Sequence, residues 1–220
     1  MIKQSVIDEW KRDFDRRKPR QVISNLLSAQ AFQYLKSNDF AFVIGLISDQ
    51  SISSERAWAL PLYLAERLDQ AQLTPELVLQ HASDLAEIIR EKPALHRFPG
   101  RMADYFIAAA NRFVALELPL RGNFTNKMYS DLQNELMGFN GVSVKKAGLG
   151  ILIQSIDFGQ KIVAQDRSSA LLDAHVNRFL AQYTATEKNT IADATEIFRL
   201  INPANPALVS TWIWSKDKFD

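Results

Sequence analysis

Two short strings in the second half of the chain place reactive side chains at expected helix starts. Residues 141–147 read GVSVKKA, which puts Lys145 at the start of a helix, directly after a turn that contains a glycine. Residues 172–176 read LDAHV, which puts Asp173 at the start of another helix. A lysine amine can act as a nucleophile, and a carboxylate can stabilise positive charge and move protons. On two converging helix starts, such a pair can cleave an N-glycosidic bond.

The composition is that of an ordinary globular protein. The chain has 220 residues, of which 47% are hydrophobic and 23% charged, enough for one large domain or two smaller lobes. The net charge of +1 argues against wholesale coating of nucleic acid, although a local basic face is compatible with it. Cysteine is absent, which excludes disulfides, thiolate zinc sites and a cysteine-held iron–sulfur cluster.

The N-terminal residues are charged throughout and lack the apolar centre of a signal peptide. The longest apolar run, residues 40–47, is too short to span a bilayer. We therefore expect a cytoplasmic protein without a membrane segment, associated with the nucleoid if the source is prokaryotic.

The apolar pattern predicts an all-α protein, because helical periodicity dominates and alternating strand patterns are almost absent. Several helix starts carry cap signals, such as Thr74 before Pro75 and Asn205 before Pro206. We expect a loop over residues 158–169. Helices are predicted over 4–15, 20–35, 39–48, 54–68, 75–80, 83–91, 101–116, 126–137, 144–156, 174–183, 191–200 and 206–213.

Residues 132–153 have the pattern of two helices joined by a hairpin. The hairpin covers residues 140–143, and the second helix begins at Val144. Such a turn exposes backbone N–H groups at a helix N-terminus, which can bind a phosphate oxygen, and Lys145 and Lys146 add positive charge beside it. Taken alone, the same residues also fit an ordinary turn between two helices with lysines on the surface.

These strings resemble the helix–hairpin–helix DNA glycosylase superfamily, which includes endonuclease III and the 8-oxoguanine glycosylases. The family pattern is a hairpin of the form LPGVGxKxA, then an apolar helix, then VDxH. Residues 139–147 read FNGVSVKKA and residues 172–175 read LDAH. By this resemblance, Lys145 falls on the family's catalytic lysine and Asp173 on its catalytic aspartate.

The chain departs from the family pattern in three respects. Asn140 replaces the hairpin proline and Ser143 replaces the second hairpin glycine. Lys145 and Asp173 lie 28 positions apart, more than in the relatives, with the excess in residues 158–169. The iron–sulfur cysteines of endonuclease III are absent, as they are in other branches of the superfamily.

Further matches extend the resemblance to about residues 30–185. Residues 42–51 read FVIGLISDQS, similar to the family's early helix ending in LLSxQ, and residues 98–103 give a weaker match. His175 matches the family's histidine, and it has no metal partners among the three histidines, so we interpret it as structural. The resemblance implies no metal and no cofactor. It implies contacts to DNA from Gln50, Gly141, Ser143, Lys146 and Arg178.

The resemblance implies a bifunctional DNA N-glycosylase/AP lyase that acts as a monomer on double-stranded DNA containing a damaged base, here of the 8-oxoguanine type. The damaged nucleotide is flipped into a pocket, Lys145 attacks the sugar and forms a Schiff base, and Asp173 stabilises the developing charge. Because the attack needs the neutral amine, we expect desolvation, the helix dipole or Lys146 to favour loss of its proton. Two helical lobes are predicted, 36–145 and 1–35 plus 146–220, with the pair facing the cleft between them.

Two other interpretations stay open. The chain can be a non-catalytic helix–hairpin–helix DNA-binding module, or an all-α protein-interaction domain in which both strings are accidental and Asp173 only caps its helix. The basic run at residues 16–20 is typical of a solvated helix end, with a DNA-facing patch as the alternative. Large aromatic residues are interpreted as core, although one of them, or Phe219, can line a base pocket. The aromatic residues assigned to the core are Trp58, Phe106, Phe113, Trp212 and Trp214.

Overall fold

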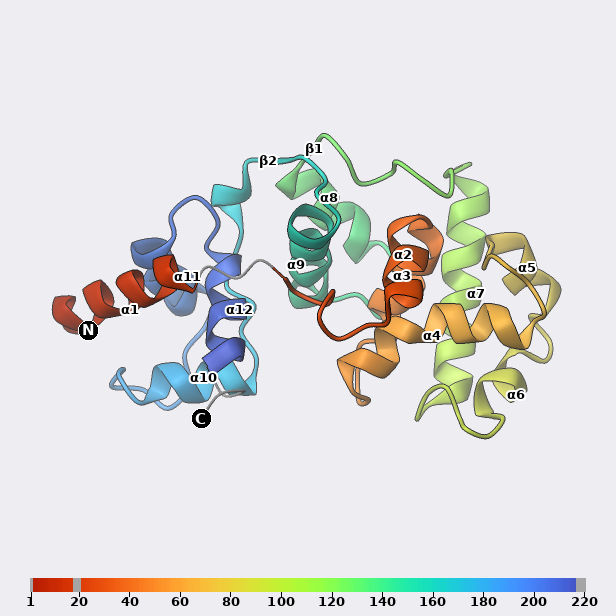
Figure 1. Cartoon of the computed structure of the whole chain (residues 1–220), viewed down its shortest axis with the longest axis horizontal. Helices are drawn as coiled ribbons and strands as arrows, with labels where there is room; N and C mark the ends of the chain where they lie inside the picture. The colour runs from red at the N-terminus through yellow and green to blue at the C-terminus, as the bar shows by residue number, and fades with distance from the viewer. Residues whose placement is uncertain (1, 18–20, 217–220) are drawn as a thin grey trace. The chain divides into compact units, whose positions relative to one another are not determined.

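The structure is a computed structural model that describes residues 2–17 and 21–216. Its architecture is all-α, as predicted (Figure 1). A short parallel pair joins β1 (Lys127–Met128) to β2 (Ile162–Val163). The helices are α1 (Gln4–Arg16), α2 (Ala29–Lys36), α3 (Asp39–Ser48), α4 (Ser54–Arg67), α5 (Pro75–Gln80), α6 (Leu85–Arg90), α7 (Pro99–Ala115), α8 (Tyr129–Met137), α9 (Val144–Leu152), the π-helix η1 (Ile153–Asp157), the 3-10 helix η2 (Gln165–Arg167), α10 (Ala174–Ala181), α11 (Ile191–Ile201) and α12 (Ala207–Lys216).

The chain divides into two compact units. The first takes its described residues from 1–22, 126–133 and 144–220, and the second from 23–125 and 134–143. Lys145 and Asp173 both belong to the first unit. The predicted lobes, 36–145 and 1–35 plus 146–220, differ from these units at residues 23–35, 126–133 and 144–145, and their assembly around a cleft stays a prediction.

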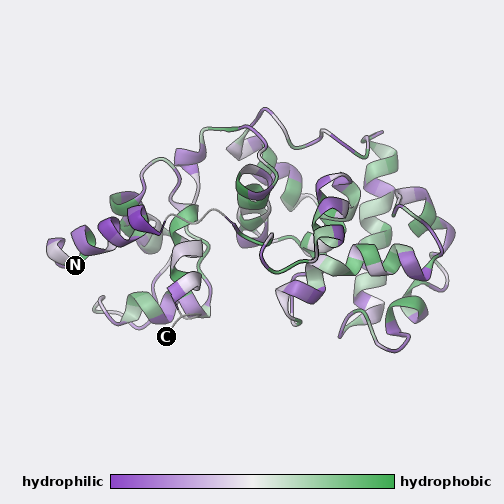
Figure 2. Ribbon diagram, in the orientation of Figure 1, coloured by the Kyte–Doolittle hydropathy of each residue, from purple (hydrophilic) through white to green (hydrophobic). Residues whose placement is uncertain are grey.

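The second unit is built around α3, whose ten residues are all buried. A helix that is apolar on every side belongs at the centre of a core, and α3 packs against α2, α4 and α7. Asn38 caps it, since the side-chain oxygen accepts a hydrogen bond from the backbone N–H of Ala41 at 2.9 Å. Hydrophilic and hydrophobic residues share the surrounding helices α4 and α7 in Figure 2, as expected for helices with one buried face.

The first unit has a core that joins both ends of the chain. Trp10 and Phe14 of α1 lie with their ring centroids each 6.3 Å from that of Trp212 in α12. The same cluster contains Leu152 at the end of α9 and Val176 in α10. The helices that begin at the two predicted catalytic positions therefore rest on one hydrophobic core.

Several predicted bounds shift by one to three residues, and the helix predicted over 144–156 continues after Leu152 as the π-helix η1. Three further predicted elements differ more from the structure. The helix expected over 20–35 begins only at Ala29, because Ser28 caps it and the preceding backbone is held elsewhere: the N–H of Val22 donates to the Asp157 carboxylate. The helix expected from 126 begins at Tyr129, because the two residues before it pair with β2. The expected loop over 158–169 contains β2 and η2.

Among the helices of residues 2–17 and 21–216, none combines the length and the apolar character that a membrane span requires.

The hydrogen bond between Tyr34 and the backbone of Leu73 can be tested by its effect on stability. The Tyr34 hydroxyl accepts this bond from the N–H of Leu73 at 2.6 Å, and Leu73 is fully buried. Burial raises the pKa of Tyr34 to about 12. Tyr34→Phe leaves that buried N–H without its acceptor, so we expect a loss of about 1–3 kcal/mol in the free energy of unfolding. Urea unfolding followed by circular dichroism measures this loss.

The matched control is Tyr63→Phe, because the Tyr63 side chain is exposed. We expect this control to change stability by less than about 0.5 kcal/mol. Equal stabilities of the two variants would contradict the role given to Tyr34.

Candidate active site

The hairpin in residues 138–143 is shaped by a glycine in a left-handed conformation. The N–H of Val142 donates to the carbonyl of Phe139 at 3.1 Å and closes the turn. Gly141 has φ +85°, and a Cβ there would lie 2.7 Å from the ring of Tyr105. Only glycine meets both conditions without strain. Ser143 is not among the residues with positive φ, so the serine that replaces the family's second glycine needs no left-handed backbone.

Helix α7 holds the hairpin in place within the second unit. The ring centroid of Phe139 lies 5.7 Å from that of Phe113, and the Arg112 guanidinium lies 5.2 Å from the centroid of the same Phe139 ring. Arg112 also lies close to Gly138, where an added Cβ would come within 2.6 Å of its Nη2 atom. The hairpin is therefore a packed element rather than a loose surface turn.

Lys145 and Lys146 occupy the first turn of α9 but have different environments. The Lys145 side chain is exposed, and its amine makes no hydrogen bond or ion pair within the described part of the chain. Lys146 is only 7% exposed. Adjacent helical residues project about 100° apart, which accounts for the difference. The burial of Lys146 contradicts the interpretation of both residues as surface lysines, and Lys145 is the exposed lysine of the two.

Asp173 is held by donors from two helices. As the N-cap of α10, its Oδ1 accepts a hydrogen bond from the N–H of Val176 at 2.8 Å, which confirms the predicted cap. Its Oδ2 accepts a second bond from the indole Nε1 of Trp214 at 3.0 Å. Because both oxygens are bonded, the carboxylate has a fixed orientation, and each oxygen keeps further acceptor capacity.

Trp214 makes a contact with Asp173 that the sequence did not reveal. It was expected in the core, but its side chain is half-buried on the last turn of α12, and it bonds to a residue 41 positions away. No local spacing signals such a contact. The other four aromatic residues assigned to the core, Trp58, Phe106, Phe113 and Trp212, are buried as predicted.

The extended segment before Asp173 is anchored by buried hydroxyl groups. The N–H of Ala170 donates to Thr195 Oγ1 at 3.0 Å, and the N–H of Leu171 donates to Ser210 Oγ at 2.9 Å. These hydroxyls come from α11 and α12, so the segment is tied to both helices. The segment places Asp173 at the start of α10, and the buried N–H groups of Ala170 and Leu171 both have acceptors.

A close contact connects this segment to α9. A Cβ added to Gly148 would lie 2.6 Å from Leu171 Cδ2 and 3.3 Å from the hydroxyl of Tyr129. Gly148 is one helical turn after Lys145, and Leu171 is two residues before Asp173. Helix α12 packs against both α9 and α10. The two predicted catalytic residues therefore lie at the starts of helices that both pack against α12 in the first unit.

Gln50 lies in a tight turn after α3, in the second unit. The N–H of Phe98 donates to His96 Nδ1 at 3.0 Å, so the ring carries its proton on Nε2. That nitrogen lies 3.0 Å from the carbonyl oxygen of Gln50 and 3.3 Å from that of Ser48, to which it donates. The Gln50 amide donates to the carbonyl of Ile47 at 3.1 Å. The buried His96 thus fixes the turn that carries Gln50.

The remaining predicted residues are placed as follows. Arg178 is exposed on α10, and His175 is half-buried in its first turn. Phe219 lies outside the described residues. Within the described residues, no three His, Asp or Glu side chains form a group that could hold a metal ion. Contact with DNA stays a prediction for Gln50, Gly141, Ser143, Lys146 and Arg178.

Comparison with known proteins gives matches in structure alone. No family model matches the sequence, and a search of curated proteins finds no significant match. A structure of MBOgg1 in complex with a low-affinity DNA ligand matches with a TM-score of 0.58 and 14% identity, over 97% of this chain and 71% of that one. A structure of Methanocaldococcus jannaschii 8-oxoguanine glycosylase/lyase, in complex with a 15-mer DNA containing 8-oxoguanine, matches with a TM-score of 0.52 and 14% identity, over 99% and 91%.

The chain has an 8-oxoguanine glycosylase-like fold. At 14% identity the likeness establishes the fold and not the activity. The predicted all-α class and the predicted resemblance in fold are confirmed. Both matches cover nearly all of this chain, including the terminal helices that the sequence motifs did not reach.

The hydrogen bond from the N–H of Leu171 to Ser210, which anchors the segment before Asp173, can be tested by its effect on stability. Ser210 is fully buried, and Leu171 is 2% exposed. Ser210→Ala removes the acceptor of a buried N–H, so we expect a loss of about 1–3 kcal/mol in unfolding free energy. The control is Ser215→Ala, whose half-buried hydroxyl only donates to the carbonyl of Trp212. Urea unfolding that ranks the control as equal to or worse than Ser210→Ala would contradict the anchor.

Proposed function

We propose that this protein is a DNA glycosylase with AP lyase activity that removes a damaged base of the 8-oxoguanine type from double-stranded DNA. One observation carries the proposal: the Asp173 carboxylate is fixed by two donors in the same core that supports α9, and α9 presents the exposed amine of Lys145. The fold supports it, since one similar structure is an 8-oxoguanine glycosylase/lyase bound to DNA containing that base.

In the proposed reaction, the neutral Lys145 amine attacks the anomeric carbon of the flipped nucleotide. A carbon–nitrogen bond to the lysine forms as the bond to the base breaks, and the base leaves with the electron pair and takes up a proton. Ring opening of the sugar then gives a Schiff base, from which elimination of the 3′ phosphate cleaves the strand. Asp173 stabilises the positive charge that develops on the sugar and accepts a proton from the attacking amine.

Trp214 acts in this account as a positioning residue. Its indole N–H fixes Oδ2 of Asp173, while the N–H of Val176 fixes Oδ1. A carboxylate that cannot rotate presents its remaining lone pairs in one direction, so no reorientation is needed when charge develops on the sugar.

Lysine chemistry can be tested by borohydride trapping on duplexes that carry 8-oxoguanine, an oxidised pyrimidine, uracil or an abasic site. We expect wild type to form a covalent adduct, most efficiently with 8-oxoguanine, and Lys145→Ala to form none. Lys188→Ala is the matched control, since it removes the amine of another exposed lysine in the first unit. An adduct that persists in Lys145→Ala would contradict the proposed nucleophile.

The absence of any adduct with wild type would contradict the lyase activity. Salt-dependent duplex binding without base release would then favour a non-catalytic DNA-binding module.

The role of Trp214 can be tested with Trp214→Phe, which keeps an aromatic ring and removes the N–H donor. A hydrogen bond to a charged group contributes about 1.5–3 kcal/mol, so we expect base release under single-turnover conditions to slow by about 10- to 100-fold, with duplex affinity unchanged. In an Asp173→Asn background, the same change should have little further effect, because the two residues act together. Full additivity of the two substitutions would overturn the positioning role.

A further inference from the structure

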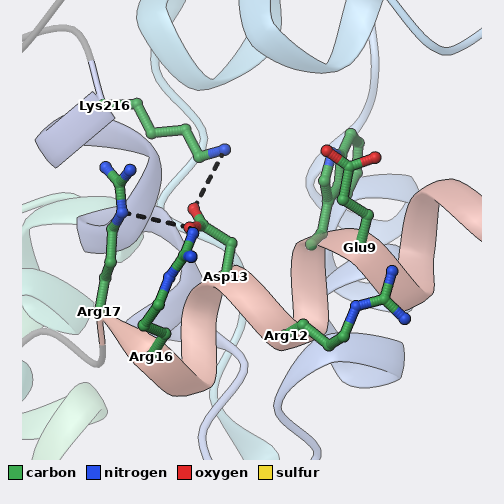
Figure 3. A pocket seen from close by; sticks show the side chains of 7 residues that line it. Glu9, Arg12, Asp13, Arg16, Arg17 and Lys216 are labelled. Carbon is green, nitrogen blue, oxygen red and sulfur yellow. Dashed lines mark hydrogen bonds and ion pairs between the residues drawn. The ribbon is translucent and has the colours of Figure 1, made fainter.

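A solvent-open hollow of about 500 Å³ lies in the first unit, between α1 and the last turn of α12 (Figure 3). Six of its seven lining residues are charged, with four cations against two carboxylates. The hollow thus has two more positive than negative side chains, in a chain whose net charge is only +1. The lining residues are Glu9, Trp10, Arg12, Asp13, Arg16, Arg17 and Lys216.

Asp13 contacts three of these four cations. Its carboxylate lies 2.6 Å from Arg16 Nη2, 3.1 Å from Arg17 Nε and 3.4 Å from Lys216 Nζ, and it accepts a bond from the Trp212 indole at 3.1 Å. Figure 3 shows the three cationic side chains converging on it. Burial raises the pKa of Asp13, but the bonds from Arg16 and Trp212 and the charge of Lys216 outweigh it, so the pKa lies below its ordinary value.

The cations keep hydrogen-bond donors that Asp13 does not use. A carboxylate accepts about four hydrogen bonds, and the four donors around Asp13 already fill it. A guanidinium has five N–H groups, and Arg16 and Arg17 each give one nitrogen to this carboxylate. Arg12, also exposed on α1, has no ion pair within the described part of the chain. Asp13 therefore organises the cluster without neutralising it.

A favourable interaction with the helix dipoles explains the presence of some of these basic residues. Arg16, Arg17 and Lys216 lie at the C-terminal ends of α1 and α12, and each helix end carries about half a negative charge. The two ends offset about one of the two surplus positive charges. They do not account for Arg12, which lies one turn before the end of α1, or for the unused guanidinium edges. The exposed pairs to Arg16 and Arg17 contribute little stability by themselves.

We propose that this hollow binds a phosphate group of the DNA backbone, an inference that rests on the proposed function for the identity of the polymer. Planar guanidinium groups match phosphate oxygens in paired hydrogen bonds, and several of them around one point are typical of phosphate sites. The side chains of Arg16 and Arg17 are 73% and 50% exposed, so a continuous backbone can reach them.

The hollow is physically connected to the candidate active site. Lys216 and Trp214 share the last turn of α12, where Lys216 contacts Asp13 and Trp214 contacts Asp173. One turn of helix thus carries a contact to the proposed phosphate site and a contact to the proposed catalytic carboxylate. Of the basic run at residues 16–20, the structure describes Arg16 and Arg17, and this proposal adopts the DNA-facing alternative for these two residues.

The test compares Arg12→Gln/Arg17→Gln with wild type in binding to an undamaged duplex oligonucleotide, measured by fluorescence anisotropy over about 50–200 mM salt. Asp13 keeps Arg16, Trp212 and Lys216 in this variant. We expect a several-fold weaker affinity and a shallower salt dependence, by about 0.9 in slope for each phosphate that the variant no longer binds. The matched control is Lys188→Gln/Arg199→Gln, which removes two exposed positive charges outside the hollow.

The outcomes separate this inference from the proposed function. Equal salt slopes in the Arg12/Arg17 variant and the control would overturn the phosphate site. If the salt dependence of duplex affinity becomes shallower only in the Arg12/Arg17 variant, the phosphate site is supported. If wild type also releases no base, the glycosylase activity is contradicted while the phosphate site stands. If wild type binds no duplex, the inference of a DNA phosphate is overturned, and thermal stabilisation by inorganic phosphate that is absent only from the Arg12/Arg17 variant would assign the hollow to a free phosphoanion.

Discussion

The bond between Trp214 and Asp173 connects the end of the chain to the start of α10. A carboxylate at a helix N-cap normally satisfies one backbone donor and leaves its other oxygen to solvent. Here the second oxygen accepts from an indole on α12, so the orientation of Asp173 depends on where α12 lies. Helix α12 is in turn held by the core that it shares with α1, α10 and α11. The terminal helices, which carry no recognisable motif, therefore determine the geometry of the candidate site.

Buried polar groups do much of this positioning. Ser210 and Thr195 accept from backbone donors in the segment that precedes Asp173, and Ser168 accepts from the first N–H of α12. Each bond gives a buried N–H group an acceptor and so avoids the free-energy cost of leaving it unpaired. Each bond also fixes the position of the segment against the neighbouring helices. The tight approach of Leu171 to Gly148 adds a steric constraint from α9. Satisfied backbone donors and close packing together hold two helix starts that are distant in sequence.

The sequence predicted the features that depend on residues close to one another in the chain, such as helix bounds and caps. Helices α3 and α5 begin and end where their apolar pattern and caps place them, and Asp173 caps α10 as expected. It missed the late start of α2, since the contact between Val22 and Asp157 spans 135 positions. It also missed Trp214, the buried state of Lys146 and the convergence of basic residues on Asp13. These features depend on long-range contacts or on which face of a helix a residue occupies. A motif of consecutive residues specifies neither.

The most direct test of the account is to identify the residue that carries the sugar. Wild-type protein would be trapped with borohydride on an 8-oxoguanine duplex, digested with protease and nuclease, and analysed by tandem mass spectrometry. We expect a sugar remnant on the Lys145 side chain, because that amine is exposed at the start of α9 while its neighbour is buried. A remnant on Lys146 or on the N-terminal amine would contradict the assignment of Lys145 and Asp173 as the reacting pair.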